Sequence, residues 1–148
     1  MKIALTGHRP QRLNGQEEDV ARWISDQLAK REDEIEEVYS GMAQGADQMF
    51  AKIAQELELP VICCYPYKRK NFYHNEREII DKAEDVRFIS EKYTGNKVYW
   101  LRDKYMVDNC DLLLAVFDGV KEGGTWLTIE YANRIGKPIE YFNVKPKE

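Results

Sequence analysis

Apolar and polar residues follow two periods along this chain, one typical of buried strands and the other of helices. Short unbroken apolar runs such as Leu112–Phe117 have the length of strands that are buried on both faces. Between these runs apolar residues recur at helical spacing, as at Val20, Trp23, Ile24 and Leu28. The predicted strands are residues 2–6, 37–40, 61–65, 86–90, 112–117 and 139–143. The predicted helices are residues 16–31, 44–58, 73–83, 97–109 and 125–135.

Strands and helices alternate strictly in this pattern. Such an order predicts an α/β fold of the Rossmann-like, doubly wound type, with a mainly parallel sheet and helices on both faces. The length of 148 residues fits one domain, residues 1–148. Ligands of such sheets bind at the carboxyl ends of the strands, so the loops that follow the strands are the first places to search for a site.

The loop after the fifth predicted strand has the features of an anion site. Asp118-Gly119 ends the strand, and Gly123-Gly124-Thr125 opens the next helix. Glycines let backbone N–H groups approach a phosphate closely, and the positive end of the helix dipole favours its charge. The alternative is a flexible loop in which Thr125 is only the N-cap of the helix. The first interpretation makes a phosphate-bearing small molecule the candidate ligand.

The turn after the first predicted strand contains Gly7, His8 and Arg9. Arg9 can make a forked contact to phosphate or carboxylate, and His8 can add a donor or a ring for stacking. The alternative is a surface turn in which Arg9 is solvated and Pro10 fixes the bend.

The loop after the second predicted strand, residues 41–47, resembles the loop at 119–125 in its glycine spacing. One interpretation is a second anion cradle formed by Gly41 and Gly45, with Asp47 available to a ribose hydroxyl. The other is close strand-to-helix packing, with Asp47 complementing the helix dipole. In a doubly wound sheet the three loops converge on one crevice.

Four further places in the chain carry candidate chemistry. Arg102 lies on the helix before the fifth strand, where it either faces the ligand or is a solvated surface residue. The basic and aromatic stretch 65–70 is either a lid over a base or phosphate, or a charged surface loop. Trp126 and Tyr73 are candidates to cover a base.

Composition narrows the classes of partner. A net charge of −4 and a pI near 5.4 argue against general nucleic-acid affinity, because binding the phosphate backbone needs a basic face. Cys63 and Cys64 are adjacent on a strand and point to opposite faces, so no disulfide framework is expected and a cytoplasmic location is favoured. No apolar run approaches about 18 residues, so neither a signal peptide nor a membrane span is predicted. His74 and the cysteines lack metal-ligand spacing, so we expect no metal and no cofactor.

Three segments are familiar together: TGHRP, SGMAQGAD, and RDKYMVDNCDLLLAVFDG followed by EGGTWLTIEYA. They resemble the SLOG superfamily, a Rossmann-like group that includes DprA-type DNA-processing proteins and LOG-type nucleotide phosphoribohydrolases. The resemblance covers nearly the whole chain and is nearest to short, stand-alone bacterial and phage members. Other SLOG domains are proposed to sense nucleotide-derived ligands, including NAD-derived signals. The resemblance therefore implies binding or sensing of such a molecule, and it allows a homodimer, since SLOG relatives commonly dimerise.

The resemblance to LOG-type enzymes implies a second function, cleavage of the N-glycosidic bond of nucleoside 5′-monophosphates. Those enzymes use the arginine of an R-K-x-x-M segment and the glutamate of P-G-G-x-G-T-x-x-E. Arg102 and Met106 keep the first spacing, although Asp103 replaces the lysine, and the glycines and threonine of the second motif remain at 123–125.

The glutamate of the second motif is missing, because Thr128 stands at its position. Glu130 is two residues further along and points about 200° around the helix from Thr128. A reaction through an oxocarbenium-like state needs a carboxylate placed against the ribose or the attacking water. Ligand binding is therefore the leading hypothesis, and the enzyme alternative needs Glu130 to act as a substitute acid.

DprA-type relatives bind single-stranded DNA, which requires an extended basic and aromatic groove. An acidic chain with one short basic loop fits that poorly, so a nucleic-acid partner is not expected. The catalytic residues under the enzyme alternative are Arg102 and Glu130. The candidate ligand-binding residues are Gly7, His8, Arg9, Gly41, Gly45, Asp47, Arg102, Asp118, Gly123, Gly124 and Thr125.

Overall fold

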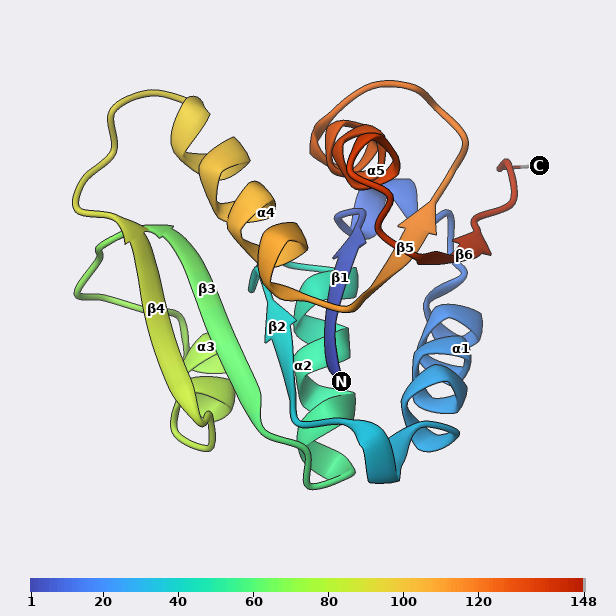
Figure 1. Cartoon of the computed structure of the whole chain (residues 1–148), viewed down its shortest axis with the longest axis horizontal. Coiled ribbons are helices and arrows are strands. Elements are labelled where there is room, and N and C mark those ends of the chain that lie inside the picture. Colours follow the sequence, from blue (N-terminus) through green and yellow to red (C-terminus); the bar gives the residue numbers. More distant parts are fainter. Residues whose placement is uncertain (148) are drawn as a thin grey trace.

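The computed structural model describes residues 1–147, in which strands and helices alternate along the chain (Figure 1). The strands are β1 (Lys2–Gly7), β2 (Glu37–Ser40), β3 (Val61–Tyr67), β4 (Asp85–Ser90), β5 (Leu112–Phe117) and β6 (Ile139–Asn143). The helices are α1 (Glu17–Ala29), α2 (Ala46–Glu56), α3 (His74–Ile80), α4 (Lys97–Asn109) and α5 (Gly124–Arg134), with short 3-10 helices at Pro10–Arg12 and Glu32–Glu34.

The six strands form one sheet in the order β4-β3-β2-β1-β5-β6, and every neighbouring pair is parallel. The predicted α/β fold is therefore confirmed. The chain winds from β1 outward to β4, crosses back through α4, and continues from β5 to β6. The order of the strands reverses between β1 and β5, which is where doubly wound sheets hold their ligands.

Helices cover both faces of the sheet. One hydrophobic cluster joins the sheet to α1, α2 and α3, with Ile24, Phe50 and Ile79 buried in it. The opposite cluster joins the sheet to α4 and α5 through Met106 and Ala132. Cys63 lies in the first cluster and Cys64 in the second, as the alternation of side chains along a strand predicts.

The boundaries differ from the predicted ones mainly at the loops. Strand β3 continues through Pro66 to Tyr67, two residues beyond the prediction. Strand β2 ends at Ser40, opposite Cys63, so the last residues of β3 pair with β4 alone. A proline that lacks an N–H is tolerated there because one side of the strand is already an edge. Helix α2 begins at Ala46 because residues 41–45 form a separate loop.

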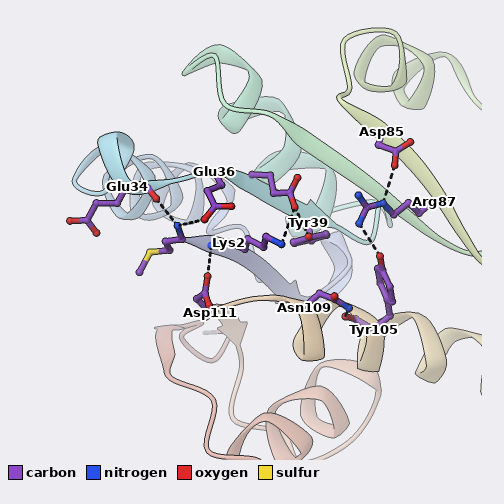
Figure 2. Close-up of polar contacts among 11 residues, drawn as sticks. Lys2, Glu34, Glu36, Tyr39, Asp85, Arg87, Tyr105, Asn109 and Asp111 are labelled. Carbon is purple, nitrogen blue, oxygen red and sulfur yellow. Dashed lines mark hydrogen bonds and ion pairs between the residues drawn. The ribbon is translucent and has the colours of Figure 1, made fainter.

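Polar contacts fix the amino ends of the strands (Figure 2). On β4, Arg87 donates from Nη1 to the Tyr105 hydroxyl of α4 at 2.9 Å, and its Nε contacts Asp85 at 2.9 Å. The backbone N–H of Lys2 donates to Asp111 at 2.7 Å, which ties the start of β1 to the turn before β5. These contacts hold the crossover helix α4 against the sheet and lie at the edge opposite the loops discussed below. Within residues 1–147, no helix has the length and apolar character to span a membrane.

Candidate functional site

A cavity of about 340 Å³ opens at the carboxyl ends of the central strands. Its walls come from the end of β1, the start of α2, the middle of α4 and the start of α5, so the three predicted loops meet there. Its lining is Leu5, Thr6, Gly7, His8, Arg9, Gln11, Arg12, Ala43, Asp47, Tyr99, Arg102, Asp103, Met106, Gly124 and Thr125.

The structure does not bring all of the predicted ligand-binding residues to this cavity. Gly41 lines an adjoining cavity of about 150 Å³ instead. Gly45, Asp118 and Gly123 line neither cavity. The predicted residues that line the larger cavity are Gly7, His8, Arg9, Asp47, Arg102, Gly124 and Thr125.

Arg102 is buried at the floor of the cavity, not solvated on the face of α4. Only 8% of the surface of Arg102 is exposed to solvent. Its Nε donates to Asp103 Oδ1 at 2.7 Å, and its Nη1 donates to the carbonyl oxygens of Gly41 at 2.7 Å and Cys64 at 3.3 Å. The guanidinium therefore ties α4 to the ends of β2 and β3.

Two carboxylates share the charge of this arginine. Burial raises the pKa of Asp47 to about 7, although Arg102 acts in the opposite direction. Burial also raises the pKa of Asp103, whose side chain is 16% exposed, and Arg102 again opposes the shift. Burial alone favours the neutral form of Arg102, but Asp103 and Asp47 outweigh it and hold its pKa above the usual value. The floor is thus a guanidinium between two acids, and it has little positive charge to offer a phosphate.

Arg9 supplies positive charge at the mouth of the cavity. It is exposed, and within residues 1–147 it forms no ion pair. Pro10 begins the 3-10 helix directly after it, with Arg9 as the N-cap. This turn holds the Arg9 backbone at the end of β1 while leaving its side chain available.

His8 joins the ends of β1 and β5. Its residue is 4% exposed, and burial lowers its pKa despite the nearby Asp118. The neutral ring accepts a hydrogen bond at Nε2 from the backbone N–H of Asp118 at 3.1 Å. This nitrogen is therefore engaged with the protein, and only the other ring nitrogen can serve a ligand.

Asp118 is likewise engaged, in this case with Arg12. Arg12 donates from Nε to Oδ2 and from Nη2 to Oδ1, both at 2.8 Å, and the N–H of Val120 donates to Oδ1 at 2.9 Å. Arg12 Nη1 also donates to the carbonyl of Glu122 at 3.2 Å. Burial acts to raise the pKa of Asp118, but the contacts with Arg12 and Val120 outweigh it and lower that pKa. Both oxygens of Asp118 thus accept hydrogen bonds that organise the loop before α5.

Helix α5 begins at Gly124, one residue before the prediction. Its N-cap is Gly123, with φ of 91°, and no side chain caps the helix. Thr125 is therefore inside the first turn and is not the N-cap. An uncapped N-terminus that borders a cavity leaves backbone N–H groups and the positive end of the dipole facing the space where an anion can bind.

The loop after β2 has its backbone groups already occupied. The N–H of Ala46 donates to the carbonyl of His8 at 3.1 Å, and the N–H of Gln48 donates to Ala43 at 3.2 Å. A Cβ on Gly45 would lie 2.5 Å from the His8 carbonyl oxygen. Of the two interpretations of this loop, packing describes Gly45, whereas Ala43 and Asp47 line the cavity.

The acid expected under the enzyme alternative is not at the site. Glu130 is exposed on α5 and lines neither cavity. Thr128 is fully buried and donates to the carbonyl of Gly124 at 2.7 Å. Because two residues of an α-helix turn it by about 200°, Glu130 faces solvent where Thr128 faces the protein.

The residues proposed to cover a base are also elsewhere. Tyr73 is 73% exposed and Trp126 stacks on Phe117 with ring centroids 5.8 Å apart. Neither lines a cavity. Sequence reasoning missed Arg12, Tyr99 and Asp103. Of these only Asp103 had a signal, since it stands where a lysine was expected beside Arg102. No group of His, Cys, Asp and Glu within residues 1–147 has the arrangement of a metal site.

Comparison with known proteins shows which family this chain matches and which solved structures share its fold. The model of the YspA SLOG family matches residues 3–144. A UPF0398 protein of Listeria monocytogenes is 24% identical over 158 residues, covering 95% of this chain and 87% of that protein. DNA processing protein A (DprA) from Streptococcus pneumoniae has a TM-score of 0.73 at 19% identity, across 95% of this chain and 49% of that one. The molybdenum cofactor binding protein from Rippkaea orientalis has a TM-score of 0.65 at 18% identity, across 96% of this chain and 76% of that one. At these identities the two structures share the fold.

Proposed function

The chain belongs to the YspA SLOG family, and from that premise we propose that it binds or senses a nucleotide-derived small molecule, a nucleoside phosphate or an ADP-ribose-like compound. The observation that carries the proposal is the cavity at the point where the strand order reverses, into which Arg9, Asp47 and the start of α5 all face. Its volume of about 340 Å³ falls within the range of small-molecule sites.

The two ends of the cavity differ in charge, and this difference matches the parts of a nucleotide. The uncapped start of α5 and the unpaired Arg9 favour a phosphate at one end. Asp47 disfavours an anion near the floor but accepts hydrogen bonds from hydroxyl groups. A sugar phosphate that directs its hydroxyls to the floor satisfies both ends.

The related proteins support a small ligand in this fold. The Rippkaea protein is named for binding the molybdenum cofactor, a small molecule, whereas DprA is named for DNA processing. The net charge of −4 makes the DNA alternative the less favourable for this chain. A role in the cytoplasm as a homodimer remains part of the proposal.

Calorimetric titration with AMP, NAD and ADP-ribose tests the proposal. We expect saturable binding of at least one of them, and Arg9→Ala to weaken that binding at least tenfold, since Arg9 forms no ion pair within residues 1–147 and its charge is available to the ligand. Arg22→Ala is the matched control, because its side chain is 70% exposed on α1. Equal binding by the Arg9 variant would remove the turn after β1 from the site, and no binding of any ligand would reject the function.

A second function, hydrolysis of the N-glycosidic bond of a nucleotide, is favoured by one observation. Asp103 is a mostly buried carboxylate in the cavity wall, near the start of α5, and it contacts Arg102. A carboxylate beside the sugar stabilises positive charge that develops on the ribose as the base departs. Under this alternative Asp103 takes the role that the enzyme motif assigned to Glu130.

Chromatography of the ligand recovered after titration separates the two functions. Intact ligand indicates a sensor or carrier, and free base indicates an enzyme. Under the enzyme alternative, Asp103→Asn abolishes base release while Glu130→Gln retains it. Loss of release in the Glu130 variant alone would reject Asp103 as the acid.

A further inference from the structure

A second cavity of about 150 Å³ adjoins the larger one at the carboxyl ends of β2 and β3. The two cavities share Arg9, Ala43, Tyr99 and Arg102, so they are two parts of one cleft. The function proposed above uses only the larger part, which leaves the smaller part without an assigned occupant.

Tyrosine rings form the outer wall of the smaller cavity. Tyr67 at the end of β3 and Tyr99 near the start of α4 both line it, with ring centroids 6.3 Å apart and planes at 88°. Tyr93, from the loop between β4 and α4, packs edge-on against Tyr67 at 5.7 Å. Tyr93 is 52% exposed and Tyr99 is 38% exposed. Aromatic rings that are held in a cluster and still face a cavity offer surface for another ring.

Apart from Arg9, which borders both cavities, the charges beside these tyrosines are already used within the protein. Arg69 contacts Glu76 at 2.8 Å, and its guanidinium lies 4.7 Å from the Phe72 ring centroid and 5.2 Å from that of Tyr65. Arg102 is held by Asp103 and two carbonyls. Away from Arg9, which it shares with the larger cavity, the smaller cavity presents aromatic faces and backbone, which suit a flat, weakly polar ring better than a second phosphate.

We propose that this tyrosine-lined cavity is the subsite for a planar heteroaromatic ring, the base of the bound nucleotide, which stacks on Tyr99 or Tyr67. The inference rests on the proposed function and adds to it the orientation of the nucleotide in the cleft. The phosphate lies at the start of α5, the sugar lies over Asp47, and the base extends past Ala43 toward the end of β3.

Titration with AMP and with ribose 5-phosphate, which lacks the base, tests this orientation. For Tyr99→Ala and Tyr67→Ala we expect AMP affinity to fall about tenfold, because stacking on an aromatic ring is lost. The affinity for ribose 5-phosphate stays unchanged in Tyr67→Ala, because Tyr67 lines only the smaller cavity, and this also shows that the phosphate end is still folded. Tyr73→Ala is the control, since Tyr73 lies outside both cavities.

Tyr99→Leu extends the test, because leucine keeps apolar surface on α4 but removes the aromatic face. It should also bind AMP less tightly than the wild-type protein. Equal loss of AMP and ribose 5-phosphate affinity in Tyr67→Ala would place the sugar phosphate in this cavity and overturn the proposal. Unchanged AMP affinity in both alanine variants would overturn it as well. Failure of the wild-type protein to bind either ligand would instead reject the proposed function itself, and this inference with it.

Discussion

Two loops of this protein look alike in sequence and differ in structure. Gly41–Gly45 after β2 and Gly119–Gly123 after β5 each place two glycines four residues apart between a strand and a helix. The first loop is packed against the end of β1, and its helix has donors bonded to protein carbonyls. In the second loop Arg12 donates a hydrogen bond to the carbonyl of Glu122, and the helix that follows begins without a side-chain cap beside the cavity.

The difference lies in what approaches each glycine. At Gly45 the neighbour is the backbone carbonyl of His8, which cannot move without moving β1. At Gly123 the nearest atom is Nη1 of Arg12, 3.1 Å from a Cβ placed there, at the end of a long side chain. One glycine therefore serves packing of the fold, whereas the other belongs to a loop whose shape depends on an ion pair. The spacing of glycines alone does not distinguish a packing loop from a binding loop.

The largest expected effect is that of Gly45→Ala. Gly45 has φ of 95° and ψ of −131°, and a Cβ would meet the His8 oxygen at 2.5 Å. We expect a loss of about 3–5 kcal/mol in the free energy of unfolding, from backbone strain and overpacking together. Chemical denaturation measures it.

Gly119→Ala is the matched control for Gly45→Ala. Gly119 has φ of 83°, but a Cβ there has no neighbour within 4 Å. Its cost should be about 1 kcal/mol, from backbone strain alone. Similar losses for the two variants would show that the loops are packed alike and would erase the distinction.

The acids that flank the two loops, Asp47 and Asp118, should contribute to stability with opposite dependence on pH. The folded pKa of Asp47 is raised from 3.8 to about 7, so folding is favoured by Asp47 below pH 4 and loses that contribution as the pH rises to about 7. The lowered pKa of Asp118 gives a contribution that is complete above pH 4 and is lost only below it.

Asp47→Asn should therefore remove a dependence of roughly 2–4 kcal/mol between pH 4 and pH 8. Asp118→Asn should lower the free energy of unfolding, and the size of this loss should stay constant from pH 5 to pH 8. The measurement is urea denaturation across this range, with each variant compared with the wild-type protein at each pH. A difference between wild type and Asp47→Asn that does not change with pH would show that the pKa of Asp47 is not raised in the folded protein.

The strands and helices could be predicted from the sequence because the patterns that define them are local. The bounds of β2, α4, β5 and β6 coincide with the predicted ranges, since each is an apolar or amphipathic run ended by glycine, proline or polar residues. Topology then placed the three loops at one edge of the sheet, because the carboxyl ends of parallel strands share that edge.

The details of the site were not predictable in the same way. Arg12 and Asp118 are separated by 106 positions, and no spacing rule joins them. Asp103, an acid in the cavity wall, is next to Arg102 in the chain, and the pattern of the related enzymes directed attention to α5 instead. Side-chain pairs between distant segments depend on packing, which local sequence patterns do not encode.

A smaller effect on stability is expected for Arg12→Ala. This variant breaks two hydrogen bonds to Asp118, in an ion pair whose arginine side chain is 35% exposed and thus partly screened by solvent. We expect a loss of about 1–2 kcal/mol. Because Arg12 also holds the carbonyl of Glu122, amide hydrogen exchange should quicken in residues 118–124 and stay unchanged in residues 41–47. Faster exchange in both loops would mean that they form one unit.

The smallest effect on stability, with a separate effect on binding, is expected for Gly124→Ala. Gly124 is the first residue of α5, and the nearest atom to a Cβ there is Asp103 Oδ2 at 3.7 Å, an ordinary contact. The free energy of unfolding should change by less than about 0.5 kcal/mol, because alanine suits a helix and no strain is introduced. The added methyl group nevertheless occupies space at the wall of the cavity, so AMP affinity should fall while stability does not. Calorimetry on this variant therefore distinguishes the two loops. Replacing a glycine that is needed for packing lowers the stability of the protein, whereas replacing a glycine that is needed for ligand binding lowers only its affinity for the ligand. Unchanged AMP affinity would mean that the start of α5 is, like the loop after β2, only a connection between a strand and a helix.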